Sequence, residues 1–452
     1  MEKDMTKGSP MRLILGFSIP LLFGLLFQQF YSMVDTIIVG HYLGVDALAA
    51  VGATGSVNFL IIGFCMGVCN GFAIPVAQEF GAGNERNLRK YVANSVWLSV
   101  LFAIVITIIV VLFCRPILQL MKTPDNIIDG SYSYIVIIFM GIPVVFLYNM
   151  TAAIIRSLGD SKTPVIFLTM AALLNIVLDL VCIIVFKWGV AGAAIATVVS
   201  QAVAGICCLL FMREKFQILK ISKEEWQVDR DFMGKLCNMG LPMGLQYSIT
   251  AIGSVVLQSA VNSIGSAAVA TVTAGGKLSM FLMCPFDAMG STMATYAGQN
   301  VGAGKLERLG KGLKSCTILG AIYSVIALGI VLSVGEYLLL LFLDSKETTI
   351  LANAQWFITI NVCFYFALAL VNIVRFFIQG MGFSKLAVFA GMFEMLARGL
   401  AGFVLVPIFG FSAVPFANPL AWIFADLFLI PAYIHCRKKL EKLMNRENVQ
   451  QS

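Results

Sequence analysis

The chain has 452 residues, of which 59% are hydrophobic and only 12% are charged, and its mean hydropathy is +0.89. A water-soluble domain needs more charged surface than this composition supplies, so the sequence excludes an ordinary soluble protein. The formal net charge of +7 needs no nucleic-acid partner, because the basic side chains gather at the ends of apolar segments. The 11 cysteines lie mostly inside those segments, which predicts buried thiols rather than a disulfide framework.

Twelve apolar segments are each long enough to cross a bilayer, because about 20 helical residues span a hydrocarbon core of about 30 Å. They are residues 12–40, 46–79, 91–114, 129–156, 164–186, 189–212, 236–264, 267–299, 315–343, 352–381, 385–409 and 412–436. The segments do not show the short alternating pattern of a membrane β-barrel. The sequence therefore predicts an all-α polytopic membrane protein with twelve transmembrane helices.

Lysine and arginine are distributed unevenly between the loops on the two sides of the predicted membrane. If the N-terminus lies inside, 24 basic residues fall on the inner side, and only Arg115, Lys122, Lys187 and Lys346 fall in outer loops. Positively charged loops stay in the cytoplasm, so we expect both termini there, with the protein in the plasma (inner) membrane. The basic tail, residues 438–452, is expected to lie at anionic lipid.

The two halves of the sequence repeat each other. QEFGAG at residues 78–83 recurs as QNVGAG at residues 299–304, which is 221 residues later. Because each copy has an even number of spans, both copies have the same orientation, and a pseudo-twofold axis along the membrane normal is expected to relate them. The predicted parts are an N-lobe of six helices at 1–212, a cytoplasmic linker at 213–235, a C-lobe of six helices at 236–437 and the tail at 438–452.

Ionisable side chains in mid-span are costly and mark functional sites. In the first half, Asp35 and Asp179 lie inside apolar runs that supply no lysine or arginine partner. A helical rise of 1.5 Å per residue places both at the depth of Thr197, in the outer half of the bilayer. Asn175 shares a helix face with Asp179, as Tyr31 does with Asp35. This set of oxygen atoms is typical of a Na⁺ site or a proton network.

In the second half, six charged side chains stand out inside the apolar runs, three of them basic and three acidic. They are Lys277, Asp287, Arg375, Glu394, Arg398 and Asp426. Glu394 and Arg398 are one helical turn apart, the spacing of an ion pair. The six charges can neutralise one another, so we expect a polar network that is mainly structural. Asp35 and Asp179 cannot be neutralised in this way unless they take up a cation or protons.

Several motifs are similar to those of multidrug and toxic compound extrusion (MATE) transporters. They are YSMVDTIIVGHYLG at 31–44, ALAAVG at 47–52, the GAG turn after the second span, RSLGDSKTP at 156–164 and NIVLD at 175–179. The resemblance covers nearly the whole chain. It implies a V-shaped pair of six-helix lobes, and an antiporter that exports bulky amphiphilic, often cationic compounds in exchange for Na⁺ or H⁺.

The resemblance also implies which residues couple cation entry to export in the prokaryotic members. The coupling set, which could hold Na⁺, would be Asp35, Asn175, Asp179 and Thr197. Further candidates for the same network are Tyr31, Asn149 and Gln201. Pro20 matches a proline at which the first helix of the family bends. Some members place a second cation site on an acidic residue of the seventh helix, but residues 241–262 contain none, so we place coupling in the first half.

The alternatives to this interpretation are a flippase, a major-facilitator carrier and an enzyme. A flippase of a lipid-linked or other amphiphilic substrate in the same superfamily would favour a basic cavity, for which Lys277, Arg375 and Arg398 are available. A major-facilitator carrier would show a different signature in the loop after the second span. An enzyme is not expected, because the chain has only two histidines, His41 and His435, and lacks HExxH and GxSxG. We expect a monomer with small-molecule substrates, lipid contacts and no cofactor beyond the coupling ion.

Overall fold

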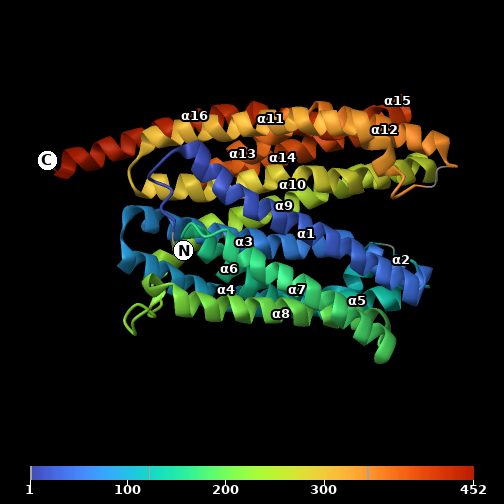
Figure 1. The fold of residues 1–452 in the computed structure, drawn as a ribbon, viewed down its shortest axis with the longest axis horizontal. Helices are drawn as coiled ribbons and strands as arrows, with labels where there is room; N and C mark the ends of the chain where they lie inside the picture. The colour runs from blue at the N-terminus through green and yellow to red at the C-terminus, as the bar shows by residue number, and fades with distance from the viewer. Residues whose placement is uncertain (1–2, 122, 344–345, 452) are drawn as a thin grey trace. The chain divides into compact units, whose positions relative to one another are not determined.

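The computed structural model describes residues 3–121, 123–343 and 346–451 (Figure 1). Lys122, which the sequence assigns to an outer loop, and Ser452, at the end of the predicted tail, lie outside these residues. Every regular element in the described ranges is a helix. The chain divides into two compact units, one formed by Met1–Asp4 and Phe23–Gly244, the other by Met5–Leu22 and Leu245–Ser452.

Seven of the described α-helices lie wholly in the first unit. In chain order they are α2 (Val45–Ala53), α3 (Gly55–Ala82), α4 (Glu85–Leu120), α5 (Ile128–Met140), α6 (Ile142–Ser157), α7 (Lys162–Leu180) and α8 (Gly189–Lys215). A π-helical turn, Val181–Val185, continues α7. The expected fourth span is broken, because α5 and α6 meet at Gly141 with a bend of 46°. Pro143 follows at the start of α6, where its missing N–H is tolerated.

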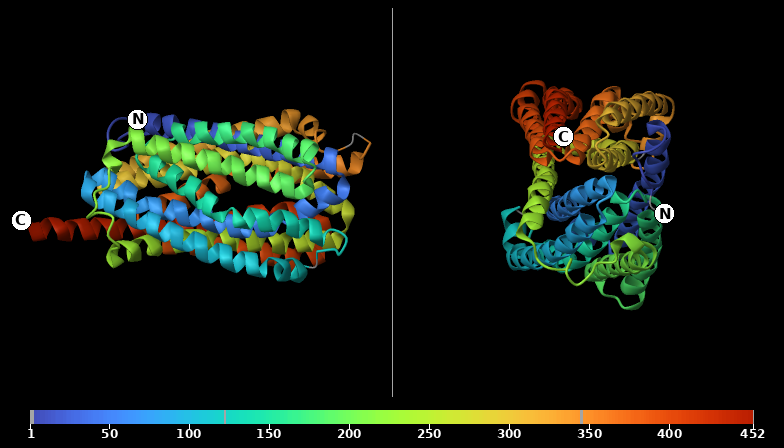
Figure 2. Two further views of the ribbon diagram at one scale, coloured as in Figure 1. Left: turned by 90° about the horizontal axis from the view of Figure 1, so that it is seen from below. Right: turned by 90° about the vertical axis from the view of Figure 1, so that its left-hand side faces the viewer.

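The second unit has the corresponding series of helices. They are α10 (Ser266–Gly302), α11 (Leu306–Leu339), α12 (Thr348–Cys363), α13 (Tyr365–Gly380), α14 (Ser384–Leu400), α15 (Val406–Phe409) and α16 (Ala417–Gln451). A π-helical turn, Ala401–Leu405, follows α14. The end of α16 projects past the other helices of this unit (Figures 1 and 2), so the helix continues through the segment expected as a separate tail.

Two long helices belong partly to each unit. In α1 (Pro10–Leu43) the boundary between the units follows Leu22, and in α9 (Arg230–Ile264) it follows Gly244. Each boundary lies two residues after a proline, Pro20 or Pro242. A proline inside a helix removes one backbone hydrogen bond and weakens the helix there. Both helices therefore pass from one unit to the other next to a point of weakened helical bonding.

The number of spans agrees with the expected fold class. Among the described residues, nine helical stretches are long and apolar enough to cross a membrane, and two bent pairs raise this number to eleven. One of the nine is Ser384–Asn445, whose 62 residues are far more than one crossing needs. Gly410, with a φ of 61°, interrupts this stretch and divides it into two crossings. The predicted all-α polytopic fold is confirmed, and the layout of twelve spans is consistent with it.

The core of the first unit depends on close contact between α3 and the first part of α9. A Cβ atom added at Gly67 would lie 2.5 Å from the carbonyl oxygen of Met243, and one at Gly71 would lie 2.5 Å from the Cα of Gly240. Such distances are far inside van der Waals contact, so only glycine allows the two backbones to approach. Small residues play this role in membrane helices, where apolar lipid gives helices no hydrophobic reason to associate.

We predict that Gly71→Ala lowers the stability of the protein by about 1–3 kcal/mol, the usual cost of overpacking a dense core. Thermal unfolding in detergent would measure the loss. Gly52→Ala is the matched control, because no atom lies within 4 Å of a Cβ built there. Equal unfolding temperatures for the two variants would show that the α3–α9 contact is looser than the geometry requires.

Candidate cation-binding site

The first unit brings together the acidic residues that the sequence singled out. Asp35 lies on α1, and Asp179 lies on α7, two residues before the π-helical turn. Such turns are rare and often occur at functional sites, because they redirect neighbouring side chains. Asp179 is completely buried and Asn175 nearly so, whereas Asp35 and Thr197 are half-buried. The local fold therefore places two carboxyl groups in an apolar interior.

The two carboxyl groups are direct neighbours, close enough to share a hydrogen bond. Neither oxygen of Asp179, nor Oδ1 of Asp35, nor Oδ1 of Asn175 receives a hydrogen bond from a described donor. Two ionised carboxylates offer only acceptors, so they approach this closely only if a proton or a cation lies between them. The orphaned oxygen atoms thus fit a site that binds a proton or a cation.

Neutral oxygen atoms complete the surroundings of the acidic pair. The amide nitrogen of Asn175 donates to Oγ1 of Thr197 at 3.4 Å, and this hydroxyl donates to the carbonyl of Ala193 at 3.1 Å. Asn175 therefore turns its carbonyl oxygen, rather than its nitrogen, toward a possible ligand. The described residues contain no group of three or more His, Cys, Asp or Glu that could hold a metal. A Na⁺ ion here would depend on neutral oxygens as well as the two carboxylates.

Two tyrosines lie within electrostatic range of both carboxyl groups. Tyr31, on α1, was expected from its spacing to Asp35, but Tyr134, on α5, was missed. The sequence carries no signal for Tyr134, since a lone tyrosine in an apolar helix is usually a packing residue. Asn149 bonds the backbone carbonyl of Val145, one turn earlier in α6. Within the described residues no hydrogen bond joins Asn149 or Gln201 to the acidic pair, so their membership of the network stays a prediction.

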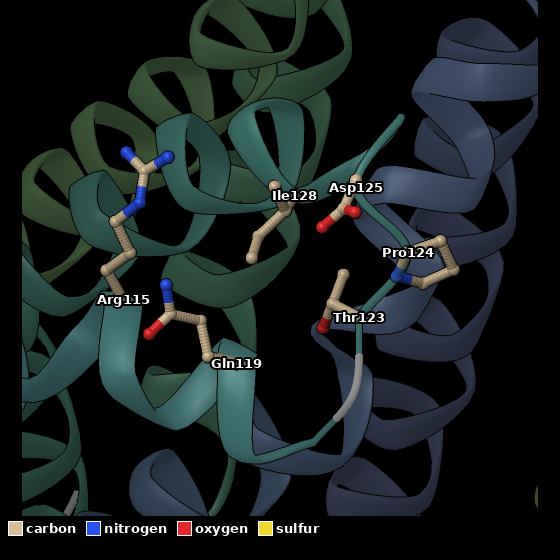
Figure 3. Close-up of a pocket in the computed structure, with 6 residues that line it drawn as sticks. All are labelled: Arg115, Gln119, Thr123, Pro124, Asp125 and Ile128. Atoms are coloured by element: carbon tan, nitrogen blue, oxygen red, sulfur yellow. The ribbon is translucent and has the colours of Figure 1, made fainter.

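An open cavity of about 470 Å³ lies elsewhere in the first unit, between the end of α4 and the start of α5 (Figure 3). Its lining residues are Arg115, Gln119, Thr123, Pro124, Asp125 and Ile128. Arg115 also forms an exposed ion pair with Asp129 at 2.8 Å. None of the residues of the acidic pair lines this cavity, so it is separate from the candidate cation-binding site.

The second unit buries a cluster of charged side chains from two helices. Arg375, on α13, is ion-paired with Glu394, on α14, and Arg398 lies 3.5 Å from the same carboxylate. Arg398 also donates to the side chain of Asn418 at 3.3 Å. All three charged residues are buried. The ion-pair spacing predicted for Glu394 and Arg398 is present in the structure.

The other three ionisable residues of the second half lie differently. Asp287, on α10, is exposed and accepts a hydrogen bond from Asn372 at 3.4 Å. Asp426, on α16, is buried and lies within electrostatic range of Arg375. Lys277 is exposed, and within the described ranges no hydrogen bond or ion pair connects it to the cluster. Arg375 thus has two further carboxyl groups near it, the exposed Asp287 and the buried Asp426, whereas Lys277 lies apart from the cluster.

We predict that Arg398→Ala lowers stability by about 3–5 kcal/mol, because removing one partner leaves buried charge uncompensated. Asp179→Asn should lower it much less, since it removes a charge that has no basic partner. Unfolding temperatures in detergent would compare them, with Arg115→Ala as a control whose exposed ion pair contributes little. An Arg398→Ala protein as stable as the parent chain would refute a structural role for the cluster.

Comparison with known proteins agrees with this geometry. The family profile MatE matches residues 20–181 and 242–425. The probable multidrug resistance protein YoeA of Bacillus subtilis is 30% identical over 362 residues, 78% of each chain. The FAD transporter of Shewanella oneidensis is 26% identical over 67% of this chain and 68% of its own. An outward-facing multidrug resistance MATE transporter structure of the MOP superfamily is 21% identical, with a TM-score of 0.89 over 98% of both chains.

The helical stretches long and apolar enough to cross a membrane, together with the matching family profile and the curated relatives, define a membrane transporter. The chain belongs to the MatE family of multidrug and toxic compound extrusion transporters. The resemblance found in the sequence motifs is thereby confirmed.

Proposed function

We propose that the chain is a secondary active multidrug efflux antiporter, which exports bulky amphiphilic, often cationic compounds in exchange for Na⁺ or H⁺. The observation that carries the proposal is that the half-buried Asp35 neighbours the fully buried Asp179, and that Oδ1 of Asp35 and both oxygens of Asp179 lack described donors. Relatives named as multidrug resistance or export proteins support the direction of transport. The coupling set is Asp35, Asn175, Asp179 and Thr197, with Tyr31 and Tyr134 beside it.

The proposed topology places both termini in the cytoplasm and the protein in the plasma (inner) membrane. The excess of basic residues at the termini and inner loops supports this orientation. Residues 1–212 form the N-lobe, 213–235 the linker, 236–437 the C-lobe and 438–452 the end that lies at anionic lipid. The protein acts as a monomer, in contact with lipid along its apolar helices.

The coupling follows from repulsion between the two carboxylates. With both ionised and no cation bound, Asp35 and Asp179 repel each other and oppose the packing of α1 against α7. A proton or Na⁺ that enters from outside removes this repulsion, and α1 repacks by bending at Pro20. Exchange requires only that cation and substrate favour different states, because a ligand with equal affinity for both shifts nothing.

We predict that Asp35→Asn abolishes coupled efflux and leaves insertion and folding intact, because it removes charge but almost no volume. Extrusion of ethidium from cells, at equal expression, would measure the effect. Asp46→Asn is the control, since Asp46 is an exposed carboxylate at the start of α2 and should leave efflux unchanged. Normal efflux by the Asp35→Asn protein would overturn the assignment of the coupling site.

We further predict that cation and substrate weaken each other's binding by the same factor, as thermodynamic linkage requires. Ethidium bound to purified protein would be titrated with Na⁺ at fixed pH, and with H⁺ in the absence of Na⁺. The titration that displaces the dye identifies the coupling ion. Displacement that persists unchanged in the Asp35→Asn, Asp179→Asn double variant would mean that coupling lies elsewhere.

A second candidate function is export or flipping of an anionic or lipid-linked amphiphile. One relative is named an FAD transporter, and the exposed Lys277 gives this chain a basic group within a membrane span. Liposomes that contain the protein would be loaded with either ethidium or FAD. Release of FAD but not of ethidium, when an ion gradient is imposed, would favour the anionic substrate.

A further inference from the structure

The charged groups around Arg375 in the second unit include two basic and three acidic side chains, and one of the acidic side chains, Asp287, is exposed. Both arginines, Arg375 and Arg398, are directed at one carboxylate, that of Glu394. These three residues together carry a single surplus positive charge. Two further carboxyl groups, Asp287 and Asp426, lie within electrostatic range of Arg375. One surplus positive charge can compensate one of these carboxylates but not both.

The two remaining carboxyl groups differ in what stabilises their ionised form. Asp287 is exposed and accepts a hydrogen bond from Asn372 at 3.4 Å. Asp426 is only 8% exposed, and its Oδ1 receives no hydrogen bond from any described donor. No ion pair to Asp426 occurs in the described part of the chain, although Arg375 is nearby. Asp426 is therefore the carboxyl group of the cluster that can least remain ionised.

We propose that Asp426 is a proton-binding site of the second unit, distinct from the acidic pair of the first unit. A proton removes the uncompensated charge without adding a bulky ligand. A metal cation would need several further oxygen ligands beside the guanidinium of Arg375, which repels it. Among the described charged and titratable groups, Arg375 on α13 acts on Asp426. Around Arg375 in turn lie Tyr247 on α9, Asp287 on α10, and Glu394 and Arg398 on α14.

This site extends the proposed function, because it supplies a second position at which proton concentration acts on the protein. The consequence for transport rests on that proposed function. Each unit then holds one neutralisable position, the pair Asp35 and Asp179 in one and Asp426 in the other. The existence of the site can be tested without transport, so its failure would leave the antiport proposal standing.

Infrared spectroscopy tests the site directly, because a protonated carboxyl group has a carbonyl-stretch band that a carboxylate lacks. The background is the Asp35→Asn, Asp179→Asn double variant, which removes any band from the first unit. We expect a remaining band near neutral pH that disappears when Asp426→Asn is added and stays when Asp46→Asn is added. If Asp426→Asn does not fold, Asp426→Glu should instead move the band in frequency.

Two results would overturn the site. One is a spectrum that is the same with and without the change at Asp426. The other is loss of the band when Na⁺ is added at fixed pH, which would make the site one for sodium. A band that persists in Na⁺ and depends on Asp426 supports the proposal.

The pH dependence of unfolding gives an independent measurement. The folded chain holds a proton at Asp426 that the unfolded chain releases at neutral pH, so this residue makes stability fall as pH rises. Asp426→Asn removes that fall, and its unfolding temperature should rise relative to the parent as pH increases. If Asp426 is ionised and paired with Arg375, the folded state binds fewer protons than the unfolded state. The variant would then lose stability relative to the parent as pH rises, which contradicts the proposal.

Discussion

The cost of placing a charge in the apolar interior determines where the functional groups of this protein lie. An ionised side chain away from water must find an opposite charge, hydrogen-bond donors, a cation or a proton. In the second unit, Glu394 finds two arginines. In the first unit, Asp35 and Asp179 find only each other and neutral oxygens. Fixed partners meet this requirement for Glu394, and in the coupling proposed above a proton or Na⁺ meets it for Asp35 and Asp179.

The backbone of the two copies repeats more closely than the side chains do. A π-helical turn occurs at residues 181–185 and again at 401–405, 220 residues later. The first turn follows Asp179 and the second follows Arg398. Pro20 and Pro242 likewise precede the points at which α1 and α9 pass between units. Both copies thus have a π-helical turn at the matching place, but the charged residue before the turn is acidic in the first copy and basic in the second.

The sequence predicted those features that are determined within a single helix or by the depth of a residue in the membrane. Hydropathy predicted the spans, and a constant rise per residue placed Asp35 at about the same depth in the membrane as Asp179. The bends at Gly141 and Phe364 were not predicted, because the apolar composition continues through each break. No pattern within α3 alone predicts the contact of Gly71 with α9, because this contact depends on how the two helices pack.

Features that depend on the packing of several helices were predicted less well. Tyr134 was missed because only packing brings α5 to the acidic pair. The sequence argument grouped Lys277 with the cluster because the numbers of basic and acidic residues matched. Matching numbers do not reveal which face of its helix a residue occupies. The structure leaves it exposed and separate from Arg375 and Glu394.

The change of sign between the two copies decides which of them can respond to cations. A guanidinium stays charged at every physiological pH, so Arg398 cannot be switched off and needs a permanent partner. A carboxylate can be neutralised by a proton or bound by Na⁺, so Asp179 can alternate between two states. The position 220 residues after Asp179 is Gly399, next to Arg398. A response of the second copy to protons therefore has to come from a carboxyl group on another helix, and Asp426 on α16 is a buried one whose Oδ1 receives no hydrogen bond from a described donor.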